Sequence, residues 1–172
     1  MHPLNAKYPA AGTIPKGTDI GHVHLKVSSI DRALDFYCGV LGFELMATLG
    51  DSAAFVSAGG YHHHIGLNTW HSRDGNPPPD RATGLYHVAI RFPTRRELAT
   101  IVRRVIEAGV PLQGASDHGV SEAVYLADPD QNGIELYRDR PREEWARTPE
   151  GDVRMFSAPL DLEALLQEGD DR

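Results

Sequence analysis

The sequence predicts an α+β domain of two similar halves, whose mixed sheets curl around a shared cleft. Residues 20–27 alternate between apolar and polar side chains, as a half-buried strand does. Apolar residues at helical spacing follow, and then short strand-like runs. The same order begins again at residue 85, about 65 residues later. This weak internal repeat predicts two units, each made of a strand, a helix and three further strands.

In the first unit, Ser28 or Ser29 is expected to cap a helix over residues 30–40. The strand at 20–27 precedes that helix. Three short strands are expected after it, over 43–48, 52–58 and 61–68.

In the second unit, a strand at 85–92 precedes a capping box, Thr94 to Glu97, which opens a helix that stops at Gly109. Three short strands are again expected, over 112–115, 121–127 and 133–138. We therefore expect an N-terminal leader (1–17), one domain (18–140) with modules 18–70 and 84–138, and a tail (141–172) with a short helix near 159–166.

Composition excludes several classes of protein. The formal net charge of -7 and the lack of a basic stripe argue against a nucleic-acid partner. Cys38 is the only cysteine, so an internal disulfide and a cysteine-based zinc site are excluded, and we interpret it as a buried bystander. No run approaches the ~20 apolar residues that span a bilayer, so no membrane is expected and a cytoplasmic location is predicted.

His22 and His87 occupy equivalent positions in the two repeats, and a local twofold would bring them together. Glu135, between Ile134 and Leu136, would then face the cleft, where a lone carboxylate needs a cation. Taken singly, each of these residues is better explained as a half-buried histidine or an ion-paired carboxylate. Together they predict a divalent metal site.

The counterpart of Glu135 in the first repeat falls near residues 65–67, which offer no ligand side chain. An open coordination position is what catalysis needs. Two imidazoles and one carboxylate suit Fe(II), although manganese and zinc also accept this set.

Several motifs resemble the vicinal oxygen chelate superfamily, which includes glyoxalases, bleomycin and fosfomycin resistance proteins and type I extradiol dioxygenases. They are Gly21-His-Val-x-Leu-x-Val, Ala33-Leu-Asp-Phe-Tyr37, Val40-Leu-Gly-Phe43 and Asp128-Pro-x-x-Asn-Gly-Ile-Glu-Leu-Tyr137. The resemblance covers about residues 18–140 and implies paired βαβββ modules around a metal cleft. Fold does not settle the reaction within such a superfamily.

Further features resemble the extradiol branch, especially catechol 2,3-dioxygenases. The strand around His63 implies that this histidine is the acid/base residue, and Tyr125 stands ten residues before Glu135. His118, followed by Gly119, corresponds to a third histidine of that branch, although its spacing from the tyrosine is slightly shorter. The tail at 139–145 is also similar. Many extradiol enzymes carry two such domains, whereas this chain has one.

The resemblance implies a metal-dependent ring-cleaving dioxygenase that inserts both atoms of O2 into a catechol-type aromatic. Fe(II) is the expected ion, with Mn(II) as the alternative. His63 would move protons, while Tyr125 and His118 would hold substrate oxygens. The expected partners are a small aromatic diol, O2 and a second or further copy of the chain.

Around this site, His24 lies two residues beyond His22 and faces the same side. It would line the oxygen pocket or orient a ligand, and the sequence does not separate these roles. Phe55 is a candidate pocket wall. His62 and His64 would point away from His63 if their strand is regular, and His71 is expected to be exposed.

Three alternatives compete with a dioxygenase. A glyoxalase-like isomerase or lyase of the same superfamily usually needs a fourth protein ligand near Gly66, which is absent. A non-catalytic binding or resistance protein generally lacks the full triad. A cupin is suggested by His62 to His64, but the capped helices and the repeat argue against it.

Overall fold

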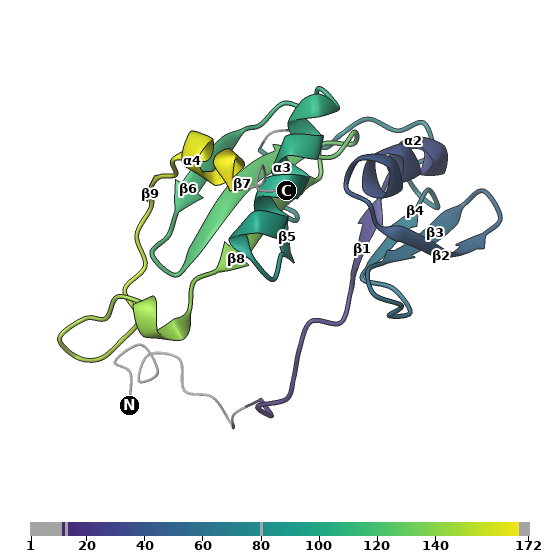
Figure 1. The fold of residues 1–172 in the computed structure, drawn as a ribbon. Helices are drawn as coiled ribbons and strands as arrows, with labels where there is room; N and C mark the ends of the chain where they lie inside the picture. The colour runs from purple at the N-terminus through teal and green to yellow at the C-terminus, as the bar shows by residue number, and fades with distance from the viewer. Residues whose placement is uncertain (1–11, 13, 80, 169–172) are drawn as a thin grey trace.

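The computed structural model describes residues 12, 14–79 and 81–168 (Figure 1). Most of the predicted leader and the last residues of the tail lie outside the described residues. Two separate mixed sheets, one from each repeat, form the framework of the molecule.

The first sheet contains four strands in the order β1-β4-β3-β2. Strand β1 runs parallel to β4, and the other pairs are antiparallel. Its elements are β1 (Val23–Lys26), α2 (Ile30–Leu34), the π-helix η1 (Asp35–Val40), β2 (Glu44–Leu49), β3 (Ala53–Ser57) and β4 (Ile65–Asn68). Ser29 is the N-cap of α2, because its hydroxyl accepts a hydrogen bond from the Arg32 amide.

The second sheet has the order β5-β8-β7-β6-β9, with β5 parallel to β8. Its elements are β5 (Val88–Arg91), α3 (Arg95–Glu107), β6 (Gly114–Asp117), β7 (Ser121–Ala127), β8 (Gly133–Asp139) and β9 (Ala158–Pro159). Thr94 caps α3 as predicted, and the helix ends before Gly109, whose φ is +72°. In the second sheet, the order β5-β8-β7-β6 therefore repeats the order β1-β4-β3-β2 of the first sheet. The predicted paired βαβββ fold is confirmed.

One hydrophobic core serves both halves. Its fully buried side chains come from the helices and from the inner faces of both sheets. They include Val27, Tyr37, Ile65 and Leu67 of the first half and Leu98, Val102, Leu126, Ile134 and Leu136 of the second.

The turn between β7 and β8 joins the two halves through polar contacts. The buried Tyr37 hydroxyl donates to Asp128 Oδ2 at 3.0 Å. The Arg32 guanidinium donates to Asp130 Oδ1, and the Asn132 side-chain amide donates to the Lys26 carbonyl oxygen. The turn therefore fixes how the first half is held against the second.

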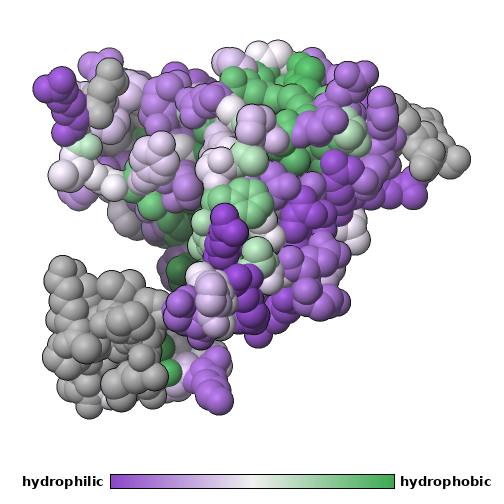
Figure 2. Space-filling model, turned by 90° about the vertical axis from the view of Figure 1, so that its left-hand side faces the viewer, coloured by the Kyte–Doolittle hydropathy of each residue, from purple (hydrophilic) through white to green (hydrophobic). Residues whose placement is uncertain are grey.

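The C-terminal segment folds back along the second half (Figure 1). A 3-10 turn, η2 (Arg142–Glu144), leads to β9, which pairs with β6, and then to α4 (Leu162–Gln167), which packs on α3. Helix α4 is the short helix expected near 159–166. Figure 2 looks at this side of the molecule, where hydrophobic side chains gather beside a largely hydrophilic surface.

Several strands start later than expected. Strands β1, β4 and β5 begin at residues 23, 65 and 88 instead of 20, 61 and 85, because the histidine-bearing residues before them are not in regular ladders. Strand β9 was not expected. Within the described residues, no helix combines the length and the apolar character needed to cross a membrane.

Candidate metal centre

His87 and Glu135 form the centre of the site in the second half. Glu135 is the middle residue of an apolar run in β8 and is 9% exposed. His87 directly precedes β5, and its Nε2 lies 2.9 Å from Glu135 Oε2. The other ring nitrogen, Nδ1, is buried without a hydrogen-bond partner. An imidazole and a carboxylate, two kinds of group that can bind a metal ion, thus meet where β5 begins beside β8.

Gly133 makes this meeting possible. A Cβ at position 133 would collide with the Tyr86 carbonyl oxygen and would lie 3.1 Å from the His87 Cβ. Only a glycine lets the two chains approach so closely at this point. The Asn-Gly-Ile-Glu motif therefore places both the carboxylate and the space for its histidine partner.

Tyr125 and His118 extend the cluster. Tyr125 stands opposite Glu135 in the β7–β8 ladder, and its hydroxyl is 3.1 Å from Glu135 Oε1 and 2.6 Å from His118 Nε2. Burial, together with the Glu135 carboxylate, raises the pKa of Tyr125 to about 12. The phenol is therefore protonated at neutral pH. The structure thus brings Tyr125 to the Glu135 side chain and His118 to Tyr125.

A cavity of about 470 Å³ opens beside this cluster. Its lining includes His87, His118, Tyr125, Gln113, Gln131 and Ser157. The volume falls within the range of small-molecule sites, and the lining mixes apolar surface with a few polar groups.

The remaining predicted residues gather in the first half. The ring of His22 lies 4.4 Å from that of His63, measured between centroids, and Phe55 lies 5.1 Å from His63. The pKa of His63 is lowered by desolvation and by the neighbouring histidines, His22 first among them. His71 is exposed, as predicted.

The counterpart of Glu135 in the first half is Gly66, and the ring of His24 occupies the space beside it. In the sheet register, His24 pairs with Gly66 as Ala89 pairs with Glu135. A Cβ on Gly66 would lie 3.0 Å from the His24 ring, so this ring covers the place where a fourth ligand would stand. His24 also packs beside Phe55 and Trp70.

The expected orientation of His62 is wrong, because residues 61–64 do not form a regular strand. His62 Nδ1 lies 2.8 Å from His63 Nδ1 instead of pointing away from it. His64 has a structural environment, since its Nδ1 is 3.0 Å from the Ser57 hydroxyl and accepts the Ala58 amide proton.

The predicted site residues thus form two clusters: His87 lies with Glu135 in one, and the third predicted ligand, His22, lies beside the predicted acid/base residue His63 in the other. Across the part of the chain that the structure describes, no three His, Cys, Asp or Glu side chains are placed to hold a metal ion. The His87 and Glu135 pair does fit one. Adjacent ligands of an octahedral ion with bonds of about 2.1 Å lie about 3 Å apart, close to the 2.9 Å observed. His22 remains a predicted third ligand.

Sequence reasoning missed several residues beside the site. Tyr86 and Gln131 line the cavity, and Trp70 packs beside His24. Phe156 and Ser157 reach His118 and the cavity from the tail. The neighbours of the predicted ligands could have been considered from the sequence, but the tail residues carry no local signal.

Residues 19–136 match the family described as the glyoxalase/bleomycin resistance protein/dioxygenase superfamily. A catechol-2,3-dioxygenase of Bacillus subtilis (strain 168) is 43% identical over 93% of this chain and 55% of the relative. Biphenyl-2,3-diol 1,2-dioxygenase 2 of Rhodococcus globerulus is 31% identical over 69% of this chain and 61% of the relative. The chain thus matches somewhat more than half of each relative's length.

The fold is also found among solved structures. A glyoxalase/dioxygenase from Nostoc punctiforme superposes with a TM-score of 0.61 at 17% identity, covering 77% of this chain and 99% of that one. At this identity the likeness supports the fold alone.

Proposed function

Because the chain belongs to the glyoxalase/bleomycin resistance protein/dioxygenase superfamily, we propose that it is an extradiol dioxygenase that opens a catechol-type ring next to its two hydroxyls. The observation that carries the proposal is the chain of contacts from His118 through Tyr125 to Glu135 and His87, beside a cavity. The named activities of the two relatives, catechol and biphenyl-diol dioxygenases, support the same reaction class.

We propose that His87 and Glu135, joined by His22, hold a divalent ion, with Fe(II) as the expected metal and Mn(II) as the alternative. Such an ion supplies Lewis acidity and a common point of attachment for the diol and O2. Both Fe(II) and Mn(II) accept a ligand set of two imidazoles and one carboxylate.

The side chains around the cavity have separate tasks in this proposal. Tyr125 donates a hydrogen bond to Glu135 or to a substrate oxygen, and His118 Nε2 forms a hydrogen bond with a second substrate oxygen. His63 transfers protons from the His22 side. The cavity walls hold the ring and exclude water, so that the reacting groups are positioned in advance.

Completion of the triad requires the first half to face a second half. Strands β1 and β5 are both sheet edges, and every residue of β2 is exposed, including Leu45, Met46 and Leu49. Free edges and exposed apolar side chains are typical of surfaces that pair with another chain. We propose that a second copy is the partner, so that His22 of one copy joins His87 and Glu135 of the other.

Co-expression of His22→Ala and Glu135→Ala chains tests this arrangement. If the triad is shared between copies, activity returns to about a quarter of wild type, because half of the dimers are mixed and each mixed dimer has one intact site of two. If the triad forms within one chain, every site lacks a ligand and no activity returns.

The reaction itself is tested by anaerobic loading with Fe(II), followed by a panel of catechols and O2. We expect a yellow ring-opened product, absent from His87→Ala and Glu135→Ala and present in the exposed control His71→Ala. Metal binding without product from any catechol would replace this function with an isomerase or lyase.

A further inference from the structure

The tail crosses the second half directly beside His118. The Phe156 amide donates to the His118 carbonyl oxygen at 3.4 Å, and the Phe156 carbonyl oxygen lies 3.0 Å from His118 Nδ1. A residue 38 positions away in the sequence thus makes two backbone contacts with one imidazole-bearing residue.

These contacts assign the protons of the His118 ring. A carbonyl oxygen can only accept, so Nδ1 must carry a hydrogen. In the neutral imidazole the other nitrogen, Nε2, then offers a lone pair. That nitrogen lies 2.6 Å from the Tyr125 hydroxyl, whose one proton it shares as a possible acceptor with Glu135 Oε1 at 3.1 Å, and it belongs to a residue that lines the cavity.

The Phe156 ring is seated on Gly119. Gly119 has a φ of +74°, and a Cβ built on it would lie 2.8 Å from the Phe156 Cζ and nearer still to Cε1. The absence of a side chain at position 119 lets one edge of the ring approach the turn that follows His118. Ser157, the next residue, lines the cavity.

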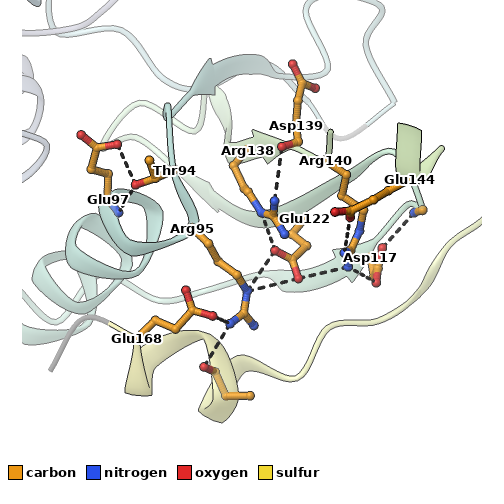
Figure 3. A network of polar contacts seen from close by, with 12 residues as sticks. Thr94, Arg95, Glu97, Asp117, Glu122, Arg138, Asp139, Arg140, Glu144 and Glu168 are labelled. Atoms are coloured by element: carbon orange, nitrogen blue, oxygen red, sulfur yellow. Dashed lines mark hydrogen bonds and ion pairs between the residues drawn. The ribbon is translucent and has the colours of Figure 1, made fainter. Parts of the chain in front are cut away.

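An ionic network also holds the turn between β6 and β7, which contains Gly119 (Figure 3). Asp117 accepts the Gly119 amide at 2.8 Å and the Arg140 guanidinium at 2.7 Å. Arg140 also contacts Glu122, which is 4% exposed and binds Arg95 as well. Arg95 in turn contacts Glu168 and the Ala164 carbonyl oxygen, next to and within α4.

The tail is therefore anchored beyond Phe156 through β9 and α4, and the turn before it through Asp117. Little freedom is left for the Phe156 backbone at the point where it meets His118. We propose that Phe156 is a positioning residue, which holds His118 with its proton on Nδ1 and its Nε2 directed to Tyr125 and the cavity.

The tautomer is the direct readout. Long-range ¹H–¹⁵N NMR spectra at a pH where His118 is neutral are expected to show a protonated Nδ1 in the wild type and in Met155→Ala, a control on the same segment with a side chain that is 67% exposed. Phe156→Ala is expected to show a mixture of tautomers, and Phe156→Tyr, which keeps the ring, to restore the wild-type pattern. Identical His118 signals in Phe156→Ala and wild type would overturn the inference.

A second readout rests on the proposed function. In the Fe(II)-loaded enzyme, Phe156→Ala should lower kcat about tenfold, the effect of one misplaced hydrogen bond, with the metal affinity unchanged and Met155→Ala close to wild type. Equal kcat in both variants would contradict the positioning role. If no catechol is cleaved at all, the NMR result still decides the tautomer, so the failure of the two proposals is distinguishable.

Discussion

At the scale of single residues, Tyr125 connects the two sides of the candidate site. Its hydroxyl has one proton but two neighbours, Glu135 Oε1 and His118 Nε2. An anionic carboxylate can only accept, and His118 Nδ1 already donates to the Phe156 carbonyl oxygen. The phenol therefore satisfies both neighbours only when Nε2 is protonated as well, that is, when His118 is doubly protonated. When His118 is neutral, one of the two neighbours is open to a substrate hydroxyl or a metal ion.

Tyr125→Phe removes this link while keeping the ring. We expect kcat to fall about 10- to 100-fold, since two polar neighbours lose a charge-assisted or neutral hydrogen bond. Fe(II) affinity should stay near wild type, because no proposed ligand is altered. Steady-state kinetics and an anaerobic metal titration measure the two quantities. An unchanged kcat would remove Tyr125 from the proposed mechanism.

At the scale of elements, the approach of β5 to β8 depends on Gly133. Gly133→Ala would place a methyl group against the Tyr86 carbonyl oxygen. We expect the free energy of unfolding to fall by about 2–3 kcal/mol, as in overpacked sites, and metal affinity to fall with it. Gly84→Ala is the matched control, because a Cβ there meets nothing within 4 Å. Chemical denaturation of both variants compares them, and equal stability would contradict this account.

Asp117, at the turn between β6 and β7, is expected to make the free energy of unfolding depend on pH. Desolvation opposes ionisation of Asp117, but the Gly119 amide and the Arg140 guanidinium outweigh it, so its pKa is lowered. A lowered pKa in the folded state stabilises the protein above the unfolded value of about 3.9. This stabilisation is lost as the pH falls through the folded-state pKa.

Asp117→Asn should therefore be less stable than wild type at neutral pH, and the difference should shrink as the pH falls below about 4. Asp51→Asn, a change at an exposed carboxylate, should show little difference at any pH. Denaturation curves across pH 2–7 test this. A difference that stays constant with pH would show that the charge of Asp117 is not the cause.

The elements themselves were largely predictable, because alternation, helical spacing and caps are local signals. The caps Ser29 and Thr94 follow from such patterns, and the repeat predicted two equivalent units. The parallel pairing of β1 with β4 and of β5 with β8 was not predicted, because no local pattern states which strands become neighbours. Strand β9 was missed because its two residues, Ala158 and Pro159, are too short a run to show an alternating pattern. They form a strand only because they pair with β6. The irregular segment before β4 was missed because it depends on side-chain contacts, such as that between His62 and His63, which the sequence pattern does not reveal.

At the scale of the whole molecule, the halves are joined by buried polar contacts of the β7–β8 turn. Tyr37→Phe leaves the buried Asp128 carboxylate without one donor, so the free energy of unfolding should fall by about 1–3 kcal/mol. Tyr61→Phe, at an exposed ring, is the control. Thermal or chemical denaturation that gave both variants the same stability would show that the Tyr37 contact contributes nothing.

The repeat predicted equivalent positions for His22 and His87, but no local pattern states how the two halves face each other. That relation depends on contacts such as Arg32 with Asp130, which lie far apart in the sequence. The clustering of His118, Tyr125, His87 and Glu135 was therefore accessible from motifs, whereas the place of His22 relative to them was not.

The most direct test of the central claim is an anaerobic Fe(II) titration of the wild-type protein, His22→Ala, His87→Ala, Glu135→Ala and the control His71→Ala. We expect one ion per chain in the wild type and the control, and affinity weakened by at least about tenfold in each of the other three variants. Wild-type-like binding in any of those three variants would contradict that residue's role, and no binding by the wild type would contradict the metal centre itself.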